Sequence, residues 1–195
     1  DGFLNGPIIA GLVVAQGKVY FGNSDGKVYS LDAADGYKVA EFQTKDKIWS
    51  NPAVDGDTVY IGSFDKKLYA LDAATLQPTK WKEFQTDGAI ISTPVVYQGT
   101  IYIGSLDRYL YAVNAADGKE KGKFLAGGWF WAKPVIYNNV IYAPNLDGKV
   151  YALDIQNGNK LSEYDLGKQS HISSSPVMVD NQVIAATEAG VIWAL

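Results

Sequence analysis

Histidine, serine and aspartate are the residue types that could build a hydrolytic centre here, since together they supply a base, a nucleophile and an orienting acid. The chain has one histidine, His171, which is followed by serines at 173–175 and by Asp180. Three adjacent serines and an aspartate in an expected turn match no catalytic motif. The residues therefore predict no catalytic triad.

Patterns for metal or phosphate binding are also missing from the sequence. The chain has no cysteine and a single histidine, which excludes the usual cysteine and histidine ligand sets of zinc. Residues 11–18 look like a phosphate-binding loop, but the stretch is one residue too long and no serine or threonine follows it. We therefore interpret this stretch as a hairpin turn.

Composition restricts the class of protein further. The 195 residues suffice for one sizeable core, and the net charge is −4, with lysine and arginine spread through the chain. Without a basic cluster, nucleic acid is not an expected partner. No run of 18 apolar residues occurs, so no membrane-spanning helix is expected. Thirteen tyrosines, five tryptophans and twenty glycines are typical of short strands joined by tight turns.

One segment of about 40 residues recurs five times and defines the elements that must position any site. The copies are visible in "NSDGKVYSLDAADG", "SFDKKLYALDAATL", "SLDRYLYAVNAADG" and "NLDGKVYALDIQNG". A marker residue steps by 40, 42, 40 and 42 along the chain, at Tyr20, Tyr60, Tyr102, Tyr142 and Ile184. Each copy reads as four short strands, and no segment has a helical period. Asp-Gly pairs such as 25–26 suit the positive φ angles of type I′ hairpins.

Four antiparallel strands in about 40 residues are typical of one β-propeller blade. The quoted stretches resemble the blades of the pyrroloquinoline-quinone-type (PQQ-like) β-propeller repeat family, and the resemblance covers nearly the whole chain. We therefore predict an all-β protein with a single β-propeller domain over residues 1–195, built of four-stranded antiparallel blades. The predicted repeats are about 12–44, 52–86, 94–126, 134–167, and 176–195 together with 1–4.

Two ring arrangements agree with this pattern. The C-terminal copy lacks a fourth strand and residues 1–4 align with one, so five blades would close if the N-terminal strand completed the last blade. The resemblance implies that relatives have seven or eight blades, so the alternative is a fragment of a larger propeller. A closed ring predicts a monomer, whereas a fragment predicts an oligomer paired through open blade edges.

Candidate site residues are those that differ between the copies, since positions that recur in every copy are explained by packing. The recurring tyrosines and aspartates, such as Tyr69, Asp65 and Asp72, are therefore interpreted as core or turn residues. The copies diverge five, three and one residues before the repeated proline, in segments that connect the blades around the central channel. The divergent residues that we select are Lys47, Trp49, Asn51, Trp129, Trp131, Lys133 and His171. Aromatic residues with polar neighbours mark a binding surface, and the alternative is that each tryptophan only packs blades together.

The resemblance also implies a tryptophan that docks onto the next blade, four residues after the turn glycine. Three copies have Ala40, Gly122 and Ser162 at this position, and the second copy has Trp81 after a longer turn. The docking motif is therefore degenerate, and the packing between neighbouring blades is expected to vary.

Function is predicted from the resemblance and from the divergent residues together. We predict a non-catalytic scaffold that binds a protein or peptide partner through the loops around the central channel, similar to bacterial outer-membrane protein assembly factors. The alternative is an extracellular domain that senses a small ligand.

A PQQ-dependent oxidoreductase is the least favoured function. The resemblance implies that such enzymes hold the quinone and a calcium ion, but the inner segments, from five to one before the proline, carry no carboxylate, and the chain has no cysteine. We therefore expect no enzyme activity and no cofactor. The resemblance implies an extracytoplasmic location, in the periplasm or on the cell surface, with the cytoplasm as the alternative.

Overall fold

The described elements of the chain are all β-strands. The computed structural model describes residues 6–167 and 170–195, and these residues form nineteen strands and no helix. The strands form five antiparallel sheets, four with four strands and a last one with three. The predicted all-β propeller with five blades is therefore confirmed. No helix capable of spanning a membrane occurs in the described residues.

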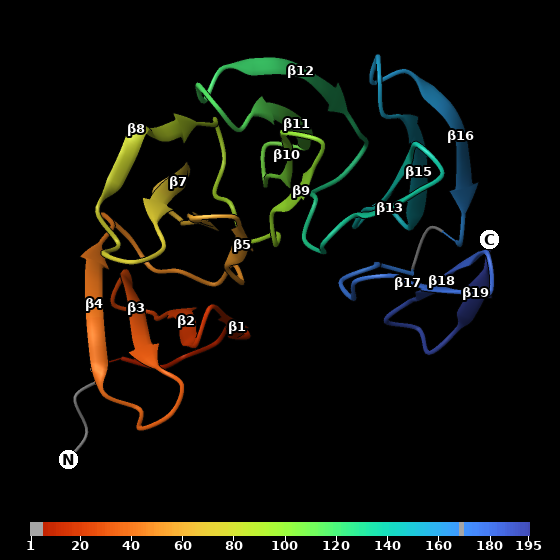
Figure 1. Ribbon diagram of the computed structural model, residues 1–195. Helices are drawn as coiled ribbons and strands as arrows, with labels where there is room; N and C mark the ends of the chain where they lie inside the picture. Colours follow the sequence, from red (N-terminus) through yellow and green to blue (C-terminus); the bar gives the residue numbers. More distant parts are fainter. Residues whose placement is uncertain (1–5, 168–169) are drawn as a thin grey trace.

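Each sheet is one blade, and its strands run in chain order from the inner to the outer side of the arc (Figure 1). Blade 1 contains β1 (Val13–Ala15), β2 (Lys18–Gly22), β3 (Lys27–Asp32) and β4 (Lys38–Gln43). Blade 2 contains β5 (Ala53–Asp55), β6 (Thr58–Gly62), β7 (Lys67–Asp72) and β8 (Pro78–Gln85). Blade 3 contains β9 (Val95–Tyr97), β10 (Thr100–Gly104), β11 (Tyr109–Asn114) and β12 (Glu120–Leu125). Blade 4 contains β13 (Val135–Tyr137), β14 (Val140–Pro144), β15 (Lys149–Asp154) and β16 (Lys160–Asp165), and blade 5 contains β17 (Val177–Val179), β18 (Gln182–Ala186) and β19 (Ile192–Ala194).

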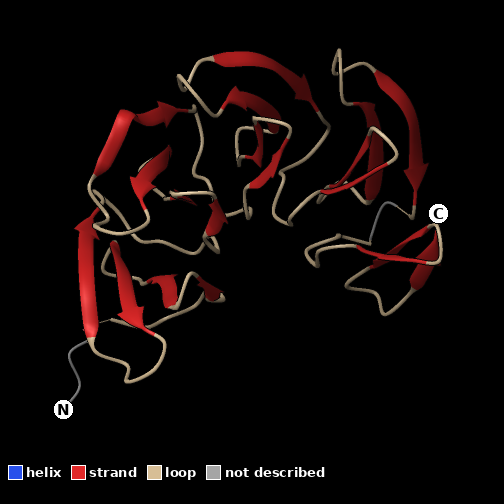
Figure 2. Cartoon of the chain, viewed as in Figure 1, coloured by secondary structure: helices blue, strands red, loops and turns tan. Residues whose placement is uncertain are grey.

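The five blades form an open arc, with blades 1 and 5 at its two ends (Figures 1 and 2). The exposure of the end blades agrees with this arrangement. Ile192 in blade 5 is 73% exposed, whereas Val150, which has the same position in blade 4, is fully buried. Residues 1–4, which the sequence predicts to supply a fourth strand to blade 5, lie outside the described residues. The described residues are therefore a run of five blades with two open faces rather than a closed five-bladed ring.

Two kinds of turn connect the strands within a blade. In four blades, the turn from the first to the second strand has two successive residues with positive φ, for example Gln98 at 47° and Gly99 at 70°, as a type I′ hairpin requires. The turn from the second to the third strand has a single positive φ, for example Lys66 at 71°. The assignment of type I′ geometry to the Asp-Gly turns was therefore wrong, because there the aspartate side chain closes the turn. In blade 2, Asp65 Oδ1 accepts the N–H of Lys67 at 3.2 Å.

Neighbouring blades pack face to face through apolar side chains. Between blades 1 and 2, Tyr20 meets Ile61 and Leu71 in one buried cluster, and similar clusters fill the other three interfaces. The glycine that ends the second strand allows the connecting segment to pack closely, because a Cβ at Gly62 would lie 2.1 Å from Ile90 Cγ2. This contact explains why glycine recurs at that position.

The aspartates of the second turn connect each blade to the segment that precedes it. Asp107 Oδ2 accepts the hydroxyl of Tyr111 at 2.8 Å and the backbone N–H groups of Asp87 and Gly88 at 3.0 and 3.2 Å. Tyr69 donates in the same way to Asp65 at 2.6 Å. These contacts support the interpretation that the recurring tyrosines and aspartates are structural.

Alkaline pH is expected to destabilise the protein through these tyrosines. Burial, together with the hydrogen bond to an aspartate, raises the pKa of Tyr69, Tyr111 and Tyr151 above the ordinary value. Because the folded state holds these protons more tightly, stability is fully present below about pH 10 and is lost as the pH rises above it. The urea midpoint should fall between about pH 9 and pH 11, less steeply in Tyr69→Phe, and a constant midpoint would contradict the expectation.

Candidate binding site on the inner rim

Connecting segments carry the chain from the outer strand of one blade to the inner strand of the next, and hydrogen bonds join successive segments. Ser50 Oγ donates to the Ser92 carbonyl, and Ser92 Oγ donates to the Ala132 carbonyl, both at 2.9 Å. The backbone N–H of Lys133 then donates to Ser175 Oγ at 3.1 Å. The small residues of these segments therefore link the blades into one continuous inner rim.

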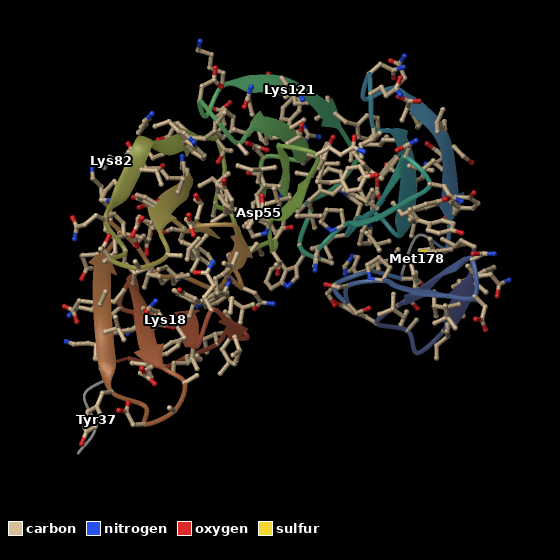
Figure 3. The ribbon with its side chains drawn as sticks, viewed as in Figure 1. Lys18, Tyr37, Asp55, Lys82, Lys121 and Met178 are labelled. Carbon is tan, nitrogen blue, oxygen red and sulfur yellow. The ribbon has the colours of Figure 1, made fainter. Side chains whose placement is uncertain are left out.

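A pocket of about 200 Å³ opens on this inner rim. Four of the predicted site residues line it: Trp49, Asn51, Trp131 and Lys133. They occupy the positions one and three before the repeated proline. The structure thus brings together residues from blades that are 82 positions apart in sequence, from Trp49 to Trp131. Figure 3 draws the side chains on the ribbon and labels Asp55, the last residue of β5.

The other three predicted residues, all five before the proline, do not line this pocket. Their backbone carbonyls are held at the junctions between blades, where each accepts an N–H from the second turn of the next blade. The donor and acceptor pairs are Phe64 to Lys47 at 3.0 Å, Leu146 to Trp129 at 3.0 Å, and Glu188 to His171 at 2.9 Å. The seven predicted residues therefore divide into a pocket group and a junction group.

Trp49 belongs to the pocket and also packs against the neighbouring turn. Its ring meets Phe64 edge-on at 4.8 Å between centroids, and Lys47 Nζ lies 5.0 Å from its centroid. Its Nε1 is buried and has no hydrogen-bond partner among the described residues. Trp49 therefore contributes the exposed part of its ring to the pocket, while its N–H lies within the packed junction.

Three of the predicted residues, Trp129, Trp131 and His171, are more exposed than Trp49. Trp131 is 37% exposed on the pocket and Trp129 is 49% exposed at the junction between blades 3 and 4. His171 Nδ1 lies 3.6 Å from Glu188 Oε2, and both side chains are more than half exposed. An exposed pair of this kind contributes little to stability.

Asn51 has a structural contact as well as a place in the pocket. Its Oδ1 accepts the backbone N–H of Gly11 at 2.5 Å. The amide is thereby fixed, so it orients the pocket wall rather than moving freely to meet a ligand. Its Nδ2 group remains the part that a ligand could use as a donor.

Three polar residues that were not among the predicted site residues also line the pocket, Thr93, Ser173 and Ser175. A signal for them was present, since they share the positions one and three before the proline with the residues that were selected. Small hydroxyl side chains at these positions do not by themselves distinguish a pocket wall from a packed connecting segment.

Comparison with known proteins assigns the family. The family model described as "Outer membrane protein assembly factor BamB" matches residues 24–195, which is most of the chain. The chain belongs to this family. No match was found among curated proteins.

Several solved structures share the fold of this chain. BamB from Moraxella catarrhalis superposes with a TM-score of 0.82 at 19% identity, over 95% of this chain and 57% of that one. The computationally designed Ika8 protein gives a TM-score of 0.82 at 19% identity, over 94% and 57% of the two chains. Quinohemoprotein alcohol dehydrogenase from Comamonas testosteroni gives 0.83 at 17% identity, over 97% and 41%. The chain therefore spans 57% of the length of the first two of these structures and 41% of the third.

Proposed function

We propose that this protein is a non-catalytic β-propeller scaffold that binds a protein partner at the inner-rim pocket. The observation that carries the proposal is the convergence of Trp49, Trp131 and Lys133 from different connecting segments on one pocket. Aromatic side chains supply much of the binding energy at protein interfaces. Membership of the BamB family supports a scaffold or assembly role.

The polar groups of the pocket favour a partner segment that carries a carboxylate. Lys133, the amide of Asn51 and the hydroxyl of Ser175 are donors, and no residue of the lining is acidic. The volume of about 200 Å³ is below the range of about 300–1,000 Å³ usual for drug-sized ligands. Both features favour an acidic side chain, or a chain terminus with an apolar neighbour, over a large free ligand.

The location that goes with this role is extracytoplasmic. The similarity to BamB from Moraxella catarrhalis and the BamB family model support an envelope setting. There a rigid propeller would present the pocket to proteins that pass through or assemble in the same compartment.

The proposal includes no quinone cofactor, because the pocket does not fit the quinone and calcium pair. Calcium takes six to eight oxygen ligands, usually including carboxylates. The pocket lining offers amide and hydroxyl oxygens but no carboxylate, and the described residues contain no cluster of three or more acidic or histidine side chains. The similarity to the quinohemoprotein at 17% identity concerns the fold alone.

Adding PQQ with calcium ions is therefore expected to leave the melting temperature unchanged. Since a ligand that binds only the folded state raises this temperature, differential scanning calorimetry with and without both additives is a direct measurement. A rise of several degrees that needs the quinone and calcium together would overturn the non-catalytic proposal.

Peptide binding to the pocket is expected to depend on Trp131. Peptides selected from a displayed random library should bind the unmodified protein and should be rich in acidic residues beside apolar ones. Trp131→Ala should weaken their binding by about tenfold or more, as measured by isothermal titration, because the ring forms an exposed wall of the pocket.

Tyr37→Ala is the matched control, since Tyr37 is an aromatic residue that is 71% exposed in a turn away from the pocket. This variant should bind the same peptides unchanged. If the peptides bound Trp131→Ala as tightly as the unmodified protein, the pocket would be excluded as their binding site. A large drop in the melting temperature of Trp131→Ala would instead identify this tryptophan as a packing residue.

A further inference from the structure

Trp81 shows what the docking position does when it holds a tryptophan. Its indole ring stacks on Tyr60 with 6.1 Å between centroids and an interplanar angle of 20°. Its Nε1 donates to the Ala115 carbonyl of blade 3 at 2.9 Å. The ring also covers Gly118, where an added Cβ would lie 2.5 Å from the ring. The interface between blades 2 and 3 therefore contains a slot that is shaped for an indole and has one hydrogen-bond acceptor.

The interface between blades 1 and 2 fills the same slot differently. The docking position holds Ala40, and the turn of blade 2 has Leu76 in place of the glycine found at 118. Leu76 is fully buried within the cluster that joins these blades, and Ala40 packs against that cluster. Tyr20 donates its hydroxyl to the Ala73 carbonyl at 2.7 Å, which satisfies the acceptor that Trp81 uses one blade later.

The interface between blades 3 and 4 has neither filler. The docking position holds Gly122, whose missing Cβ has no neighbour within 4 Å, and the turn has Gly158. A pocket of about 220 Å³ lies at this place and is lined by Tyr102, Gly122, Ile155 and Gly158 among others. These residues correspond to Tyr60, Trp81, Ala115 and Gly118 of the preceding interface. The pocket is thus the indole slot without its indole.

We propose that this slot binds a free planar aromatic ligand of about the size of indole that carries one N–H donor. The Tyr102 ring takes the place of the Tyr60 ring as the stacking surface. The Ile155 carbonyl takes the place of the Ala115 carbonyl as the acceptor. It accepts the Tyr102 hydroxyl at 3.3 Å. Because a carbonyl oxygen has two lone pairs, it can also accept the N–H of a ligand.

The surroundings of the slot distinguish it from the inner-rim pocket. It opens beside β12, on the outer side of the arc, where Lys121 is labelled in Figure 3. Lys121, Lys123 and Asp154 are among its lining residues, and Lys121 Nζ donates to Thr100 Oγ1 at 2.7 Å. Polar substituents on the ligand would therefore meet charges of both signs. This site is therefore independent of the peptide site proposed above.

Titration with indole tests the proposal. Indole should bind with one site per chain in isothermal titration, and it should raise the melting temperature by about 2–4 °C at about five times its Kd. 1-Methylindole, which lacks the N–H, should bind about fivefold more weakly. A capped Gly-Trp-Gly peptide distinguishes the source of the ring, and tighter binding of the peptide than of indole would overturn the assignment to a free ligand.

Two variants locate the binding. Gly122→Trp should fill the slot from within, raise the melting temperature and abolish indole binding. Should this single tryptophan fail to reach the slot, residues 120–123 can be replaced by the blade 2 sequence of residues 78–83, which supplies the longer connection of Trp81. Indole binding that persists in a filled variant would place the ligand elsewhere and overturn the proposal.

Trp81→Ala is the positive control for the slot geometry. This variant should gain a second indole site between blades 2 and 3, with a larger rise in melting temperature than the unmodified chain shows. Rescue of Trp81→Ala by indole, without any effect of indole on the unmodified chain, would show that the slot at Gly122 is not competent and would reject the proposal.

Discussion

Trp81→Ala is expected to lower the free energy of unfolding by about 3 kcal/mol, the lower end of the range for a tryptophan truncated in a core. The variant loses the stacking on Tyr60 and the hydrogen bond to the Ala115 carbonyl. It also leaves a void against Gly118 that a rigid turn cannot fill. Urea denaturation followed by circular dichroism measures the loss, and the melting temperature should fall by about 6–12 °C.

Trp129→Ala is the control for this prediction, because Trp129 is 49% exposed and lies outside the buried clusters. It should cost about 1 kcal/mol or less. Equal losses for the two variants would mean that the docking contact adds nothing beyond the general effect of removing an aromatic ring.

Gly62→Ala is expected to destabilise the protein by about 3 kcal/mol or more, although it adds a single methyl group. The new Cβ would lie 2.1 Å from Ile90 Cγ2 and 3.0 Å from the Ile90 carbonyl oxygen. Relief would require the connecting segment to move away from the strand, which would disturb the hydrogen bond from Ile90 N–H to the Ser63 carbonyl. Denaturant titration would report the loss as a lower midpoint.

Gly122→Ala is the matched control, since this glycine also lies in a strand but has no atom within 4 Å of an added Cβ. It should be neutral or slightly stabilising. The double variant Gly62→Ala with Ile90→Ala should cost less than the sum of the two single changes, because the shortened side chain removes part of the clash. Additive losses would contradict the contact as the cause.

The blades were predictable because a repeated sequence must repeat its packing. The apolar alternation of the third strands, as in β7 and β15, and the spacing of about 40 residues fix four short strands per copy. A closed ring and an open arc could not be distinguished from the sequence, because the angle between neighbouring blades depends on how side chains fill each interface. No pattern in a single copy reports that angle.

The sequence predicted which segments form the candidate site, but not which of their residues line the pocket. Divergence before the proline indicated the inner rim, and Trp49, Trp131 and Lys133 do line a pocket there. The sequence could not show that the backbone of Lys47 is held by the N–H of Phe64 at the blade junction. That contact joins the segment between blades 1 and 2 to the turn between β6 and β7, so it depends on the geometry of that turn.

The unfilled slot at Gly122 also bears on how the molecule opens. In repeat proteins each unit contacts only its neighbours, so stability is a sum of the units and of the interfaces between them. The interface between blades 3 and 4 lacks both the leucine and the tryptophan that fill the two preceding ones. The buried cluster between blades 4 and 5 is smaller still. Blade 5 should therefore open first and the slot between blades 3 and 4 second, and amide hydrogen exchange should detect blades 1–3 as the most protected unit.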